Sequence, residues 1–205
     1  MVERKAMRLV CVGLDMSFTG TGFCLLDNEK EKADTIKTKP ADFPIDIERR
    51  VHIANEVFSR MLVDAEDKID VGLVCIEDYY VPMSSKQMGS AVKLIELGSH
   101  IRERMYAKGI PFVVIQPTRL KKWVTGKGNS PKSMMLKEMY KKFGKDYADD
   151  NQADAAGLAR MARHILEFDM VISNHKYTEY TKYQEDVMKK IFDDSKKYNW
   201  TPSST

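Results

Sequence analysis

Two short apolar runs constrain the fold of this chain more than any other feature. Residues 9–14 read LVCVGL and residues 71–76 read VGLVCI, and each run is followed at once by an acid, Asp15 or Glu77. A short, continuous apolar run is typical of a strand that is covered on both faces. We therefore expect a sheet between helices, with two of its strands ending in carboxylates.

The other segments alternate between strand and helix patterns around these two runs. The apolar patterns and turn residues predict strands at residues 8–17, 18–28, 35–38, 70–76 and 111–115. Helical spacing predicts helices at residues 47–65, 84–107, 117–124, 132–143 and 150–168. An opening meander followed by alternating elements predicts an α/β fold with a mixed central sheet flanked by helices.

The length of 205 residues suits one well-buried domain with a tail. We expect the domain to cover residues 1–168 and a C-terminal extension to cover residues 169–205. The extension is polar and aromatic, and its pattern predicts a helix near residues 180–198.

Composition excludes several classes of protein. Hydrophobic residues make up 43% and charged residues 31%, which is ordinary for a globular protein and excludes a disordered chain. The apolar runs are far shorter than the roughly 20 residues needed to cross a bilayer, and the N-terminus lacks the apolar core of a secretory signal. We expect a cytoplasmic protein with no membrane partner, whose three cysteines are reduced core residues.

Positive charge is concentrated in one segment. Nine Lys or Arg residues and one acid lie between Arg119 and Lys145, although the whole chain carries a net charge of only +3. Such a segment predicts a phosphate-binding surface. The Gly126-Lys127-Gly128 step lacks the Gly-Lys-Ser/Thr of a P-loop, so nucleotide hydrolysis is not supported.

Four acids form a candidate metal site. Asp15 and Glu77 end strands, Asp154 lies in the first turns of the last core helix, and Asp150 lies one turn earlier on the same face. Clustered carboxylates repel one another, and bound divalent cations explain such a cluster most simply. Oxygen-only ligands favour Mg²⁺ or Mn²⁺, and two such ions can activate a water and stabilise a leaving oxygen.

Some of these acids have structural interpretations. Asp15 is equally consistent with a simple turn residue. Asp149 is better explained as a helix N-cap, because Gln152 three residues later completes a capping box. Asp78 projects to the opposite face of the strand from Glu77, and we leave it out of the site.

Five motifs together resemble the RuvC Holliday junction resolvases, which have an RNase H-like fold, and in particular their phage-type relatives. The resemblance runs from Val10 to Ile165. The motifs stand in the family's order: Gly13-Leu14-Asp15 with a Thr-Gly turn, Ile76-Glu77-Asp78-Tyr79-Tyr80, Gly109-Ile110-Pro111, Val124-Thr125-Gly126-Lys127-Gly128 with Pro131-Lys132-Ser133, and Gln152-Ala153-Asp154-Ala155-Ala156.

The resemblance implies roles for individual residues. Asp15, Glu77 and Asp154 would bind the metal ions. Lys132 would be the active-site lysine near the scissile phosphate, and Lys121 a second basic residue. The remaining implied DNA contacts are Lys122 and Lys127 in the basic segment, together with Tyr79 and Tyr80, which would stack on bases opened at the junction. The alternatives are solvated surface lysines and core aromatic residues.

One position departs from the family. Many members carry a second acid three residues after the one corresponding to Asp154, and here that position is Gly157. Asp150, one turn upstream, is the expected substitute as fourth ligand, and a site of three carboxylates is the alternative.

The resemblance implies a homodimeric endonuclease that resolves four-way junctions with two Mg²⁺ ions per active site, leaving 5′-phosphate and 3′-hydroxyl ends. Mn²⁺ is expected to support the activity as well. The helix predicted over residues 84–107 would pack in the dimer interface, and the small size suggests a bacteriophage source. The alternatives are a broader nuclease for flaps, forks and three-way junctions, a non-catalytic junction-binding protein, and an RNase H-type hydrolase of hybrids.

Overall fold

The computed structural model describes residues 8–27, 30–62, 69–79, 85–172 and 180–194. A five-stranded sheet runs through its centre in the order β3-β2-β1-β4-β5. The first three strands are antiparallel, whereas β1, β4 and β5 are parallel, so the sheet is mixed as predicted. The strands are β1 (Arg8–Asp15), β2 (Gly20–Leu26), β3 (Glu31–Lys37), β4 (Ile69–Glu77) and β5 (Phe112–Ile115).

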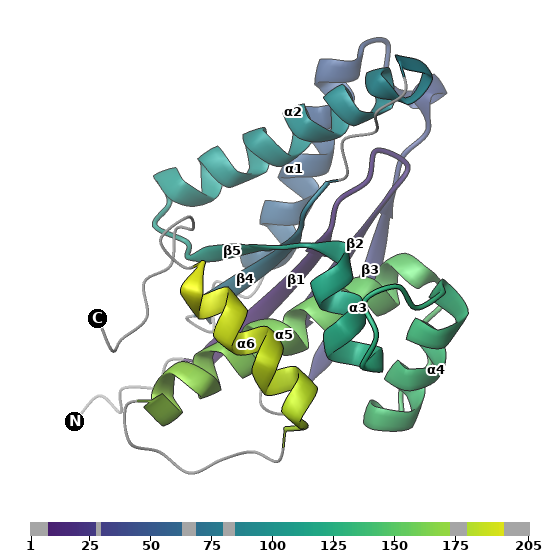
Figure 1. The fold of residues 1–205 in the computed structure, drawn as a ribbon. Coiled ribbons are helices and arrows are strands. Elements are labelled where there is room, and N and C mark those ends of the chain that lie inside the picture. Colours follow the sequence, from purple (N-terminus) through teal and green to yellow (C-terminus); the bar gives the residue numbers. More distant parts are fainter. Residues whose placement is uncertain (1–7, 28–29, 63–68, 80–84, 173–179, 195–205) are drawn as a thin grey trace, which may run out of the picture.

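Helices cover both faces of the sheet (Figure 1). One face carries α1 (Asp46–Leu62) and α2 (Ser85–Ala107), and a short 3₁₀ turn (Pro40–Asp42) precedes α1. The opposite face carries α3 (Pro117–Thr125), α4 (Lys132–Phe143), α5 (Asp150–Ile172) and α6 (Lys182–Asp193). The predicted α/β order is confirmed, and the predicted ends of most elements differ by a few residues.

Strand alternation decides which carboxylates meet the α5 side. In β1, Val12 and Leu14 belong to the apolar core under α1 and α2, whereas Cys11 belongs to the core under α5. In β4, Ile76 belongs to the core under α1 and α2, and Cys75 belongs to the core under α5. Because side chains alternate along a strand, the acid that follows each run projects toward α5.

Helix α5 lies directly on the backbone of β1 and β2. A Cβ atom added to Gly13 would come within 1.9 Å of the carbonyl oxygen of Ala155, and one added to Gly22 within 2.1 Å of that of Asn151. No side chain separates helix from strand at these points. Glycine in the strands and alanine in the helix therefore permit the close approach that carries Asp154 to the sheet.

The C-terminal extension forms a helix that joins the main core. Val187, Met188 and Ile191 of α6 are buried in the same cluster as Trp123 of α3. The predicted helix is thus confirmed over Lys182–Asp193, whereas residues 180, 181 and 194 of its predicted range are not helical and residues 195–198 lie outside the described residues. Helix α5 continues to Ile172, past the expected boundary at residue 168, and that domain boundary stays a prediction.

The three cysteines are core residues, as expected from the apolar runs that contain them. All three cysteines are buried and unpaired, and burial raises the pKa of the Cys11 thiol to about 12. Within the described ranges, no helix combines the length and the hydrophobicity that a membrane span requires.

The close contact at Gly13 makes a prediction about stability. Gly13→Ala should lower the free energy of unfolding by about 3 kcal/mol, because the added methyl group overlaps the α5 backbone and neither element can yield cheaply. Gly89→Ala in α2 is the matched control: no atom lies within 4 Å of its added Cβ, so it should be neutral or stabilise the protein by about 1 kcal/mol. Urea unfolding measures both, and equal effects would contradict the proposed packing.

Candidate active site

Asp15 and Glu77 lie beside each other at the ends of two neighbouring parallel strands. Leu14 pairs with Ile76, so the acids that follow them are adjacent across the β1–β4 ladder. The two carboxyl groups share a hydrogen bond. Burial, and then the charge of Asp15, raise the pKa of Glu77 to about 9. Burial also raises the pKa of Asp15.

Helix α5 brings Asp154 to the same place. Burial raises its pKa to about 7, and the negative charge of Asp15 acts in the same direction. Asp154 in turn raises the pKa of Glu77. Three carboxyl groups from β1, β4 and α5 therefore lie within strong electrostatic reach of one another. Such mutual repulsion is typical of a functional site and costs stability in a merely structural one.

Two lysines from the basic segment oppose this negative charge. Lys132, at the start of α4, forms an ion pair with Asp150, and this contact lowers the pKa of Asp150 and raises that of Lys132. The positive charge of Lys132 also works to lower the pKa of Asp15 and of Asp154. The positive charge of Lys121 in α3 works in the same way to lower the pKa of Glu77 and of Asp154. Both lysines that the sequence placed near the site are therefore close enough to influence its carboxylates.

The remaining predicted lysines belong to the same basic segment. Lys122 follows Lys121 in α3 and is partly exposed, while Lys127 is exposed on the loop between α3 and α4. Their contact with DNA stays a prediction.

The donor set suits a hard divalent cation in its chemistry, because it offers carboxylate oxygens alone. Its geometry is open: among the described residues, no three His, Cys, Asp or Glu side chains are grouped closely enough to hold a metal ion. The raised pKa values of Glu77 and Asp154 give a reason, since like charges without a counterion move apart or take up a proton. A cation at this place would be held by Asp15, Glu77 and Asp154.

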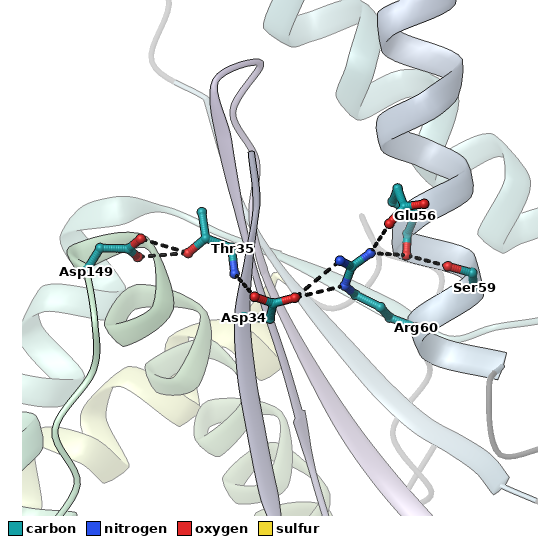
Figure 2. Close-up of polar contacts among 6 residues, drawn as sticks. All are labelled: Asp34, Thr35, Glu56, Ser59, Arg60 and Asp149. Carbon is teal, nitrogen blue, oxygen red and sulfur yellow. Dashed lines mark hydrogen bonds and ion pairs between the residues drawn. The ribbon is translucent and has the colours of Figure 1, made fainter. Parts of the chain in front are cut away.

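Asp149 is a structural residue, in agreement with its predicted role. Its Oδ1 accepts a hydrogen bond of 3.0 Å from the backbone N–H of Gln152, as an N-cap does. The reciprocal bond differs from a standard capping box, because Gln152 accepts from the N–H of Ala148. Figure 2 shows that Thr35 of β3 also donates to Asp149, at 2.9 Å from each carboxylate oxygen.

The same network continues from β3 to α1. The backbone N–H of Thr35 donates to Asp34, whose other oxygen accepts from Arg60 of α1 (Figure 2). Arg60 also pairs with Glu56. These contacts connect the start of α5 to the edge of the sheet. The carboxylate of Asp149 is thereby engaged in structural hydrogen bonds.

Position 157 faces the core. A Cβ atom at Gly157 would lie 3.1 Å from Leu120 and 3.5 Å from Val124, both in α3. An acid here would be buried among apolar side chains at a high cost in free energy. The packing favours a residue without a side chain at this position, and Asp150 as the fourth ligand stays a prediction.

Tyr79 is held in place from α2. Its hydroxyl accepts a hydrogen bond of 2.8 Å from Arg102, whose guanidinium carbon lies 5.4 Å from the ring centre. Tyr79 and Glu77 both line a small cavity of about 190 Å³. The contact of Arg102 could not be predicted from the sequence, because it joins residues 23 positions apart and leaves no local pattern. Stacking of Tyr79 on a base stays a prediction, and Tyr80 lies outside the described residues.

Solved structures of RuvC from Thermus thermophilus share this fold. One is 17% identical, covers 75% of this chain and 91% of its own, and has a TM-score of 0.54. A second, in complex with a Holliday junction substrate, is 16% identical, covers 75% and 90%, and has a TM-score of 0.57. The RuvC-like fold expected from the motifs is confirmed.

A third structure, the yeast mitochondrial Holliday junction resolvase Ydc2, is 15% identical and has a TM-score of 0.48. The match covers 75% of this chain and 76% of the yeast chain. No protein-family model and no curated protein matches the sequence. At these identities the likeness extends to the fold alone.

The raised pKa values predict how stability depends on pH. The folded chain binds protons at Glu77 and Asp154 that the unfolded chain has released above about pH 5, so stability should fall between about pH 5 and pH 9 in EDTA. Glu77→Gln should flatten this fall in melting temperature. Glu96→Gln, an exposed partner of Arg50, is the control and should keep it. A wild-type melting temperature that rises over this range would contradict the electrostatic account.

Proposed function

We propose that this chain is a metal-dependent endonuclease that resolves four-way DNA junctions. The proposal rests on the placement of Asp15 and Glu77 at the ends of neighbouring strands and of Asp154 on α5, where burial raises the pKa of each carboxyl group and the charges of two lysines act on them. A protein that only binds junctions gains nothing from buried carboxylates on a surface that faces phosphate.

The reaction is hydrolysis of a phosphodiester that leaves 5′-phosphate and 3′-hydroxyl ends. Two Mg²⁺ ions, with Mn²⁺ as a substitute, supply an activated water and stabilise the leaving oxygen when bound. Asp15, Glu77 and Asp154 would hold the ions, and Asp150 would complete the ligand set. Lys132 then exchanges its partner Asp150 for the scissile phosphate, which neutralises charge where it develops.

The substrate is branched DNA. The segment from Arg119 to Lys145 carries nine positive side chains along α3, α4 and the loops beside them. Two of these side chains, Lys121 and Lys132, act on the charges of the carboxylates. A structure with the same fold, RuvC from Thermus thermophilus, was solved in complex with a Holliday junction substrate. This likeness of fold and the match of the five motifs favour a four-way junction over a linear duplex.

The carboxylates provide the direct test of the catalytic proposal. Asp15→Asn, Glu77→Gln and Asp154→Asn should each abolish cleavage of a synthetic four-way junction in Mg²⁺, while junction binding survives or tightens. Each change removes a metal ligand without adding bulk, and it also removes repulsion of the phosphates. Asp149→Asn is the matched control, because that residue caps α5, and it should still cleave. Wild-type cleavage by any of the three variants removes that residue from the site.

Resolution of a junction needs two incisions, and one chain has one carboxylate cluster. We therefore propose a two-fold homodimer, the simplest way to supply two identical sites. Helix α2 offers a surface for it: Ala91 and Ile101 pack into the core, whereas Met88 and Val92 are 39% and 45% exposed. The exposed side chains lie one turn apart on the helix, beside Gly89.

The dimer can be tested by its mass. Sedimentation should give about twice 23.5 kDa for the wild type. Val92→Asp should produce a folded monomer, because a charge in an apolar interface is costly. Tyr140→Asp changes an exposed aromatic residue of α4 on the other side of the sheet and should leave the dimer intact. A monomeric wild type, or dissociation by both variants alike, overturns this interface.

A further inference from the structure

Helix α6 contacts the basic segment at the point where α3 ends and the loop to α4 begins. The hydroxyl of Tyr183 in α6 lies 2.7 Å from Nζ of Lys142 in α4. The same Nζ donates to the carbonyl oxygen of Val124, in the last turn of α3. One lysine thus joins three helices, and Tyr183 fixes that lysine from outside the segment.

The ring of Tyr183 also covers the turn that ends α3. Gly126 has a φ of +82°, and a Cβ atom there would lie 3.7 Å from the ring. Its N–H donates to the carbonyl of Lys122 at 2.8 Å, as in a left-handed helix cap. Beyond the turn, the hydroxyls of Thr125 and Ser130 lie 2.7 Å apart and close the loop. The ring of Tyr183 therefore packs against a turn that is also held by its own hydrogen bonds.

The two lysines that act on the carboxylates stand on either side of this turn. The charge of Lys121 in α3 attracts the carboxylates of Glu77 and Asp154. The charge of Lys132 in α4 attracts those of Asp15 and Asp154. A small rotation at the turn would move one lysine relative to the other. Misplacement of a charged group by a fraction of an ångström weakens the stabilisation of a reacting phosphate.

A second contact holds the other end of α3 to α6. Arg119 forms an ion pair with Asp194 at 2.5 Å, with the two side chains 19% and 27% exposed. Between the two ends, Val187 and Ile191 of α6 share a core cluster with Trp123. Helix α3 is thus fixed along its whole length by the C-terminal extension.

We propose that Tyr183 is a positioning residue for the nuclease site: through Lys142 and Gly126, it sets the turn that aligns Lys121 and Lys132 with the carboxylates. This role rests on the proposed function, and it gives the C-terminal helix a part in catalysis although the helix contributes no side chain to the carboxylate cluster.

The test compares two tyrosines of the same extension. Tyr183→Phe keeps the ring and removes the hydroxyl that holds Lys142. Tyr180→Phe is the matched control: it makes the same chemical change, but its hydroxyl bonds to Glu167 of α5, away from the turn. With saturating enzyme and Mg²⁺, Tyr183→Phe should slow junction cleavage by about fivefold to tenfold, the effect of one lost hydrogen bond. Its Kd for the junction should stay within twofold, and Tyr180→Phe should cleave at the wild-type rate.

Hydrogen exchange tests the brace without cleavage. The amides of residues 124–130 should exchange faster in Tyr183→Phe and at the wild-type rate in Tyr180→Phe. A double variant of Tyr183→Phe with Lys142→Met should cleave no more slowly than Lys142→Met alone, because both residues act along one path. Equal slowing by the two tyrosine variants, or unchanged exchange in Tyr183→Phe, overturns the proposal. If the wild type cuts no branched DNA, the proposed function fails, and the exchange experiment still decides whether the brace exists.

Discussion

The contact between α5 and the backbone of β1 and β2 is the constraint on which the rest of the site depends. It exists because Gly13 and Gly22 leave no side chain between helix and sheet, and because Ala155 and its alanine neighbours present a flat helix surface. The contact places the first turns of α5 over the ends of β1 and β4. Without it, Asp154 would stand one side-chain layer away from Asp15 and Glu77, and the three carboxyl groups would not interact.

That same contact creates an electrostatic cost. Three acids lie within electrostatic reach of one another, and burial raises the pKa of each. The chain offsets this cost from one direction, through Lys121 and Lys132 on the two helices of the basic segment. The two helices are themselves held by Lys142 and by α6. The buried acids lower the stability of the fold, and functional sites commonly retain such groups. A purely structural core would place apolar side chains at these positions.

Much of the fold could be predicted from local patterns, and the rest needed tertiary information. Apolar runs and helical spacing predicted the order of elements and the acids of the site. The start of β3 was missed, since EKADTIK is a polar edge strand whose first four residues carry no apolar alternation. The contacts of Arg102 with Tyr79, and of Tyr183 with Lys142, join distant parts of the chain and leave no periodic signal. Local spacing predicted the cap at Asp149, whereas the role of Lys132 follows from the resemblance alone and stays a prediction.

The most direct measurement of the central claim is the cleavage of matched DNA substrates in Mg²⁺, with the same arm sequences arranged as a four-way junction, a three-way junction, a flap and a linear duplex. The account predicts that the four-way junction is cut much faster than the others, by paired nicks on strands of like polarity, and that EDTA stops the reaction. Faster cutting of flaps than of four-way junctions, or one unpaired nick per junction, would contradict it.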